Sequence, residues 1–114
     1  MNQKQPVRQG DVLFIPCRRL LSRGLKRREN GVVAYGEVTG HAHRLATECM
    51  AMSGVFECGN GLVVRVSEHG LALSGDPGAT FIHEEHAPVH LLPGDYDVRI
   101  QREYDPVAIR KVAD

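Results

Sequence analysis

Tryptophan is absent from this chain of 114 residues, and three phenylalanines and three tyrosines are its only large aromatic side chains. No apolar run approaches the roughly 20 residues that a membrane-spanning helix needs. The first nine residues, MNQKQPVRQ, lack the apolar segment of a secretory signal. We therefore expect a cytoplasmic protein with no membrane partner, folded as a single domain over residues 1–114.

Cysteine is also scarce, and several reactive motifs are missing. Cys17, Cys49 and Cys58 form an odd set without a CxxC pair, which fits a reducing compartment better than a disulfide framework. No serine lies in a GxSxG context, and no glycine-rich loop carries the lysine of a phosphate-binding loop. The sequence therefore gives no support to a serine nucleophile or a nucleotide-binding loop.

Net charge is zero, but its distribution along the chain is uneven. Residues 1–28 carry eight basic side chains and one acid, whereas residues 29–114 carry six basic and thirteen acidic side chains. Such asymmetry predicts contact with nucleic acid or an acidic partner. It is equally compatible with a basic loop lying on the protein's own acidic face, or with a solvated loop. No aromatic residue is interleaved for base stacking. The candidate phosphate-binding residues are Arg18, Arg19, Arg23, Lys26, Arg27 and Arg28.

Short runs of β-branched and aromatic residues, separated by glycine and proline, predict an all-β fold. The clearest is 96–104, where Tyr96, Val98 and Ile100 alternate with polar residues. Asp105-Pro106 is typical of a helix start, so we expect a short helix over 106–112. The sequence thus predicts a small antiparallel barrel or sandwich with a short C-terminal helix. The other expected strands are 12–15, 32–38, 49–57, 62–66, 80–83 and 89–92.

Four of the six histidines lie in two short segments roughly forty residues apart. On a strand, His41 and His43 would project from the same face, which gives half of a metal site. His83 and His86 would lie on opposite faces of a continuous strand, so only one could join that pair unless the chain bends before Pro88. Carboxylates for ligation or for orienting the imidazoles are Glu48, Glu84 and Glu85. Alternatively, HAH is a surface turn and HEEH a solvated loop.

Gly36, His41-x-His43, Glu48 and Gly54 resemble the first cupin motif, with one residue too few after Gly36 and after Glu48. The stretch Leu92-Pro93-Gly94-Asp95-Tyr96 resembles the P-x-G turn region of the second motif. The resemblance implies a small β-barrel in which the HxH pair, the glutamate and a later histidine hold iron, manganese, zinc or nickel. Cupins place that last histidine after the turn, whereas no histidine follows His90 here.

The segments 9–16 and 83–106 also resemble a group of small uncharacterised proteins from bacteria and their phages. This second resemblance implies a recurrent module and no particular chemistry.

We expect a protein that binds a divalent metal ion. Two possible functions use that ion, and a third competes with them. An open site would support an enzyme, with Glu84 or Glu85 as general base. Zinc would favour hydrolysis, and iron held by His41, His43 and Glu48 would favour oxygenase chemistry. Four protein ligands would instead make a structural staple. The competing function is a non-catalytic module that uses the basic stretch 18–28. Exposed edge strands are compatible with a homo-oligomer.

Overall fold

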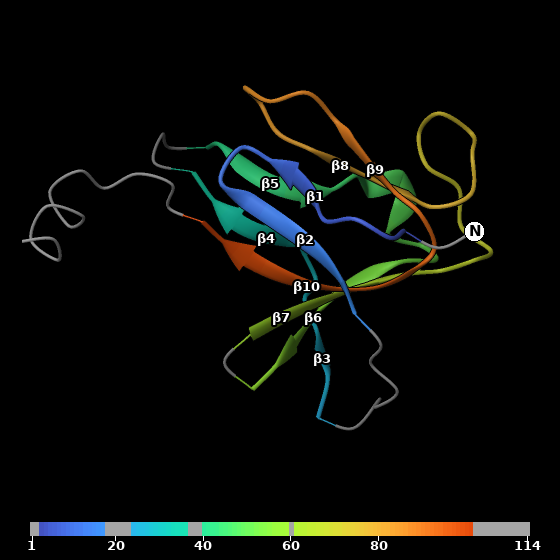
Figure 1. Cartoon of the computed structure of the whole chain (residues 1–114), viewed down its shortest axis with the longest axis horizontal. Helices are drawn as coiled ribbons and strands as arrows, with labels where there is room; N and C mark the ends of the chain where they lie inside the picture. Colours follow the sequence, from blue (N-terminus) through green and yellow to red (C-terminus); the bar gives the residue numbers. More distant parts are fainter. Residues whose placement is uncertain (1–2, 18–23, 37–39, 60, 102–114) are drawn as a thin grey trace, which may run out of the picture.

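The computed structural model describes residues 3–17, 24–36, 40–59 and 61–101, which form two antiparallel β-sheets (Figure 1). The six-stranded sheet has the order β1-β2-β10-β7-β6-β3, and the four-stranded sheet has the order β4-β5-β8-β9. The strands of the first sheet are β1 (Val7–Gln9), β2 (Val12–Cys17), β10 (Gly94–Ile100), β7 (Gly61–Val66), β6 (Gly54–Cys58) and β3 (Lys26–Arg27). Those of the second are β4 (Val32–Tyr35), β5 (Ala42–Leu45), β8 (Ala79–Ile82) and β9 (Val89–Leu91).

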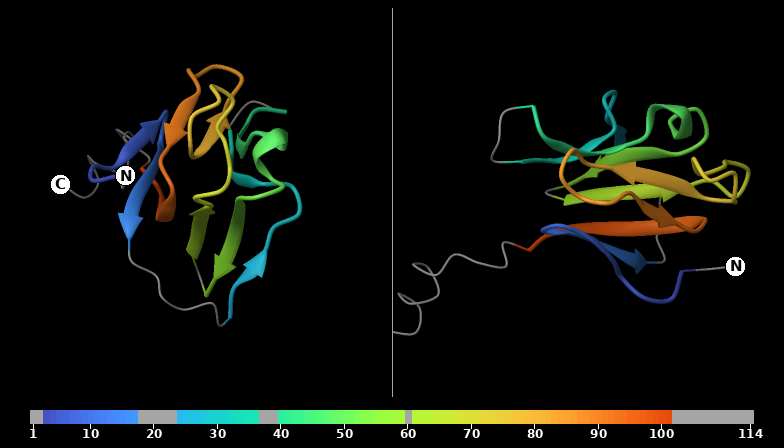
Figure 2. Two further views of the ribbon diagram at one scale, coloured as in Figure 1. Left: turned by 90° about the vertical axis from the view of Figure 1, so that its right-hand side faces the viewer. Right: turned by 90° about the horizontal axis from the view of Figure 1, so that it is seen from above.

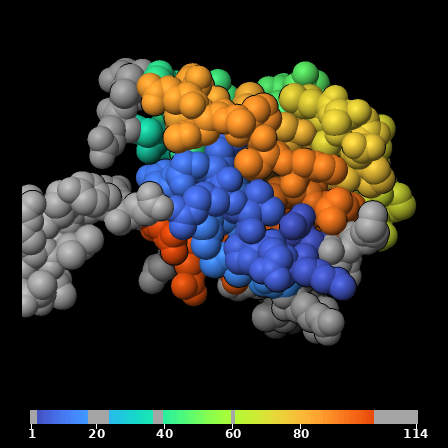
Figure 3. Space-filling model, turned by 45° about the horizontal axis from the view of Figure 1, so that its top comes forward, coloured from blue at the N-terminus to red at the C-terminus, as the bar shows by residue number. Residues whose placement is uncertain are grey.

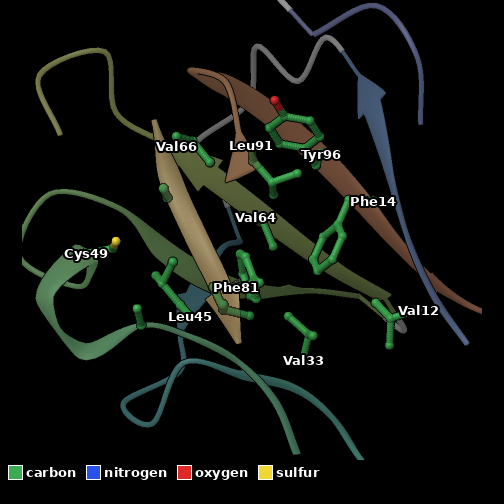
Figure 4. Packing of buried hydrophobic residues seen from close by; sticks show 13 residues of the cluster. Val12, Phe14, Val33, Leu45, Cys49, Val64, Val66, Phe81, Leu91 and Tyr96 are labelled. Atoms are coloured by element: carbon green, nitrogen blue, oxygen red, sulfur yellow. The ribbon is translucent and has the colours of Figure 1, made fainter. Parts of the chain in front are cut away.

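Figure 2 shows the arrangement of the two sheets, and buried side chains from both of them pack together in the core (Figure 4). Phe14 on β2 and Phe81 on β8 are fully buried, and their ring centroids lie 4.6 Å apart. Tyr96 on β10 packs in the same cluster, and its hydroxyl donates a hydrogen bond to the carbonyl of Leu92. The all-β prediction is confirmed, and the sheets form a sandwich and not a closed barrel.

Strand β10 forms where the alternation predicts a strand, but it begins at Gly94 and ends at Ile100, whereas the expected range was 96–104. Tyr96 and Val98 point into the core, and the intervening Asp97 points to the other face of the sheet. Strands β7, β8 and β9 also form within one or two residues of the expected ranges. The helix expected over 106–112 lies outside the described residues.

Two predicted strand boundaries are wrong, and one strand was not predicted. The strand expected over 49–57 begins only at Gly54, because the chain forms a 3-10 turn, η1 (Thr47–Cys49), and a further turn before it. The strand expected to stop before Pro16 continues to Cys17. Pairing between β1 and β2 ends at Val7 opposite Phe14, so β1 does not reach Pro16. The missing N–H of Pro16 therefore costs no hydrogen bond at the edge of β2 that faces β1. Strand β1 itself was not anticipated.

Helical structure is confined to η1 in the part of the chain that the structure describes. No described helix is long and apolar enough to cross a membrane.

Candidate metal centre

His43 is the buried member of the candidate site. It lies on β5 and shares the inward face of that strand with Leu45, a core residue. Only 2% of His43 is exposed, so its ring nitrogens depend on protein partners. Nδ1 lies 3.0 Å from Oε1 of Gln9, the last residue of β1.

Gln9 fixes which nitrogen of His43 carries the proton. The Gln9 amide nitrogen donates to the backbone carbonyls of Phe81 and Ala87, at 3.0 Å each. Carbonyl oxygens only accept, so this end of the amide must be the NH2 group and Oε1 must face His43. Oε1 in turn only accepts, so Nδ1 of His43 donates the proton. In the neutral ring the lone pair is therefore on Nε2.

The lone pair on Nε2 faces a carboxylate. Oδ1 of Asp11, in the two-residue turn between β1 and β2, lies 3.3 Å from Nε2 of His43. Burial lowers the pKa of His43, the neighbouring His83 lowers it further, and the Asp11 carboxylate acts in the opposite direction. The neutral ring is thus favoured, and two acceptors face each other across this gap.

His83 and His86 complete a cluster that we call the histidine triad (His43, His83 and His86). One nitrogen of each ring lies within 4.8 Å of the others. The ring of His83 lies between the other two, with centroids 4.2 Å from His43 and 4.7 Å from His86. Burial decreases from His43 through the half-buried His83 to the exposed His86, so the cluster reaches from the interior to solvent.

The triad forms because the chain bends after β8. That strand ends at Ile82, and residues 84–86 form a bend, so His83 and His86 are not on opposite faces of a continuous strand. Nδ1 of His83 accepts a 3.0 Å hydrogen bond from the backbone N–H of Glu85. Figure 3 shows this orange segment against the blue N-terminal hairpin. Of the two expected arrangements, the structure has the bent one, which brings both histidines to one place.

Gly10 makes room for His86 at the β1–β2 turn. It has φ +59°, a conformation that glycine adopts without steric cost. A Cβ at this position would lie 2.5 Å from Nε2 of His86. The turn therefore contributes contacts from three consecutive residues: Gln9 and Asp11 to His43, and Gly10 to His86.

His41 and the two glutamates of HEEH lie at the edge of the triad. Nδ1 of His41 is 3.4 Å from Oε1 of Glu85, and its ring meets His83 edge-on at 5.8 Å. Glu84 faces the other way: it accepts from the backbone N–H of Ala42 and pairs with Arg44, each at 2.8 Å. The bond from Ala42, more than the neighbouring Arg44, lowers the pKa of Glu84. Glu84 is thus engaged in holding β5, and Glu85 is nearer to the histidines.

Glu48 and His90 lie apart from the triad. Glu48 is an exposed residue of η1 and is not among the residues whose ligand atoms converge. Nε2 of His90 lies 2.9 Å from the carbonyl of Pro77.

Half of the basic stretch can be placed. Arg27 donates to the carbonyls of Met50 and Ser53 and lies over the ring of Phe56. Arg28 pairs with Glu57 at 3.1 Å, and Lys26 is exposed. The two arginines are thus used within the fold. Arg18, Arg19 and Arg23 lie outside the described residues.

Sequence reasoning missed the contribution of Gln9, Gly10 and Asp11. No spacing rule links them to histidines more than thirty residues away. The available signal was a glycine between two polar side chains directly before a strand. That signal predicts a turn but does not say what the turn packs against.

The fold and site define a small two-sheet β protein in which the turn between β1 and β2 covers a histidine cluster. The chain belongs to the family described as "Domain of unknown function (DUF8820)", whose model matches residues 8–101. The match includes the histidine triad and the turn that covers it. No curated protein and no solved structure matches the chain. The expected likeness to an uncharacterised group is thus supported, while the cupin resemblance finds no matching family.

Proposed function

We propose that this protein binds a divalent transition metal ion through Nε2 of His43 and one nitrogen each of His83 and His86. The observation that carries the proposal is the lone pair of His43. Gln9 holds the other ring nitrogen, so a buried acceptor points into a cluster of two further imidazoles. A metal-bound histidine commonly donates its second N–H to a fixed acceptor, and Gln9 supplies that acceptor here.

The charges around the triad favour a cation. Asp11 faces His43, and Glu85 lies beside His41, so carboxylates flank the imidazoles on two sides. Imidazole ligands suit zinc, iron and nickel, and carboxylates add manganese. Zinc, iron(II), manganese and nickel are therefore the candidate ions. The proposal does not use Glu48, the ligand that a cupin centre would require.

Metal binding would draw the triad together. Ligand atoms of a tetrahedral zinc ion are about 3.4 Å apart, because each lies about 2.1 Å from the metal. The triad nitrogens lie within 4.8 Å of one another, so they would have to approach. His86 is exposed and can move, whereas His83 would have to exchange its hydrogen bond from Glu85 for the metal. The buried His43 already has the required proton position.

The test is a calorimetric titration of tag-free protein with zinc, iron(II), manganese or nickel. We expect one ion per chain and a loss of binding in His86→Ala, an exposed position whose loss should leave the fold intact. His69→Ala removes an exposed histidine outside the triad and is the matched control. Equal affinity in wild type, His86→Ala and His43→Ala would contradict the proposal.

A further inference from the structure

The turn between β1 and β2 places a carboxylate oxygen of Asp11 beside His43 of the triad. We propose that Oδ1 of Asp11 binds the same metal ion, which then ties this turn to β5 and to the segment 83–86. The inference rests on the proposed metal site and adds a residue and a role to it. The role is structural: the ion joins the six-stranded sheet to the four-stranded sheet.

Asp11 does not lie where an orienting acceptor lies. An acceptor that orients a metal-bound histidine lies at the ring nitrogen opposite the metal. For His43 that nitrogen is Nδ1, and Gln9 already occupies it. Asp11 lies at Nε2, on the side where a metal ion would bind. Its carboxylate is therefore placed as a ligand.

The separation of the two acceptors also fits a shared ion. Nε2 of His43 and Oδ1 of Asp11 are 3.3 Å apart. This equals the distance of about 3.3–3.4 Å between two ligands of one tetrahedral zinc ion. Without a proton or a cation between them, a lone pair and a carboxylate oxygen at this distance repel each other. A metal ion removes that repulsion and satisfies both atoms.

Four protein ligands change the chemistry expected of the centre. Zinc sites with three protein ligands keep a position for water or substrate, whereas structural sites are closed by a fourth. His43, His83, His86 and Asp11 would fill a tetrahedron. A zinc ion here would stabilise the sandwich and hold the turn over the triad, and it would have no open position for hydrolysis.

The test compares zinc affinity in wild type, Asp11→Asn and Asp76→Asn, using a competing chromophoric chelator. Asp76 is an exposed carboxylate in another turn, so its variant matches the change in charge. We expect Asp11→Asn to weaken binding by more than about 100-fold, since loss of an outer partner alone costs 10–100-fold. We expect Asp76→Asn to bind within about threefold of wild type, the span we assign to a distant charge change.

Hydrogen exchange of the wild-type protein gives a second, mutation-free measurement. Zinc should slow exchange of the amides of Asp11 and Val12, because the ion holds the turn closed. If Asp11→Asn binds zinc as tightly as Asp76→Asn, or if the turn amides are unaffected by zinc, Asp11 is not a ligand and the triad alone stands. If wild type takes up no metal, the proposed function fails as well.

Discussion

Replacing Gln9 by leucine tests the polar contact on which the site is built. Gln9 is only 2% exposed and serves three partners: the N–H of His43 and the carbonyls of Phe81 and Ala87. Leucine fills a similar volume but leaves all three without this partner. A buried polar group left unsatisfied costs about 1–3 kcal/mol.

The His43 N–H and the Phe81 carbonyl determine how much stability Gln9→Leu loses. His43 is buried and the bond to Phe81 is buried, whereas Ala87 is exposed and water can replace its bond. We therefore expect Gln9→Leu to lower the free energy of unfolding by about 2–6 kcal/mol, a large share of the 5–15 kcal/mol typical of a domain.

Urea denaturation of metal-free protein measures this change, read from the midpoint at an unchanged slope. Gln5→Leu, at an exposed position just before β1, is the control and should stay within about 0.5 kcal/mol of wild type. If Gln9→Leu is as stable as Gln5→Leu, the hydrogen bonds of Gln9 do not hold the turn onto His43. The assignment of the proton to Nδ1 would then lose its basis.

Three further predictions concern the turn glycines, Tyr96 and Phe81. Gly10→Ala and Gly59→Ala share a φ of +59°, and each should lose about 1–2 kcal/mol of stability. Only Gly10→Ala should also weaken metal binding, because its Cβ meets His86 whereas the space at Gly59 is open; equal metal affinities in calorimetry would refute this. Burial raises the pKa of Tyr96 to about 12. Between pH 10 and 12 the unfolded chain releases this proton and the folded chain keeps it, so stability should fall with rising pH by about 2–3 kcal/mol. Urea denaturation of Tyr96→Phe over this range should show a smaller fall, and an equal fall would count against burial as the cause. Phe81→Ala removes a fully buried ring and should cost about 3–5 kcal/mol by urea denaturation; a loss below 1 kcal/mol would show that the core rearranges to fill the space.

The elements that the sequence predicts well are those encoded by neighbouring residues. Strand β10 follows from the alternation of Tyr96 and Val98 with polar side chains, and this alternation needs no information from the rest of the chain. Strand β1 was missed because Val7–Gln9 shows no such pattern and gains its structure by pairing with β2. Cys49 is apolar and was therefore assigned to a strand, but it lies in the 3-10 turn η1 and its side chain is buried there.

The candidate site divides in the same way. The histidines were visible as two short segments, and the bend that brings His83 and His86 together was one of the expected alternatives. Gln9 and Asp11 were invisible as site residues, because only tertiary packing brings the first turn onto His43. A pattern along the chain cannot report a contact of this range unless a known motif records it.

The histidine triad accounts for most of the chemistry proposed here, and its role depends on whether an ion binds. The most direct measurement is elemental analysis of tag-free protein after zinc loading and removal of free ions, for wild type, His43→Ala and His69→Ala. We expect close to one zinc per chain in wild type and in His69→Ala, and almost none in His43→Ala. Wild-type protein that retains no zinc, or His43→Ala that retains as much as wild type, would contradict it.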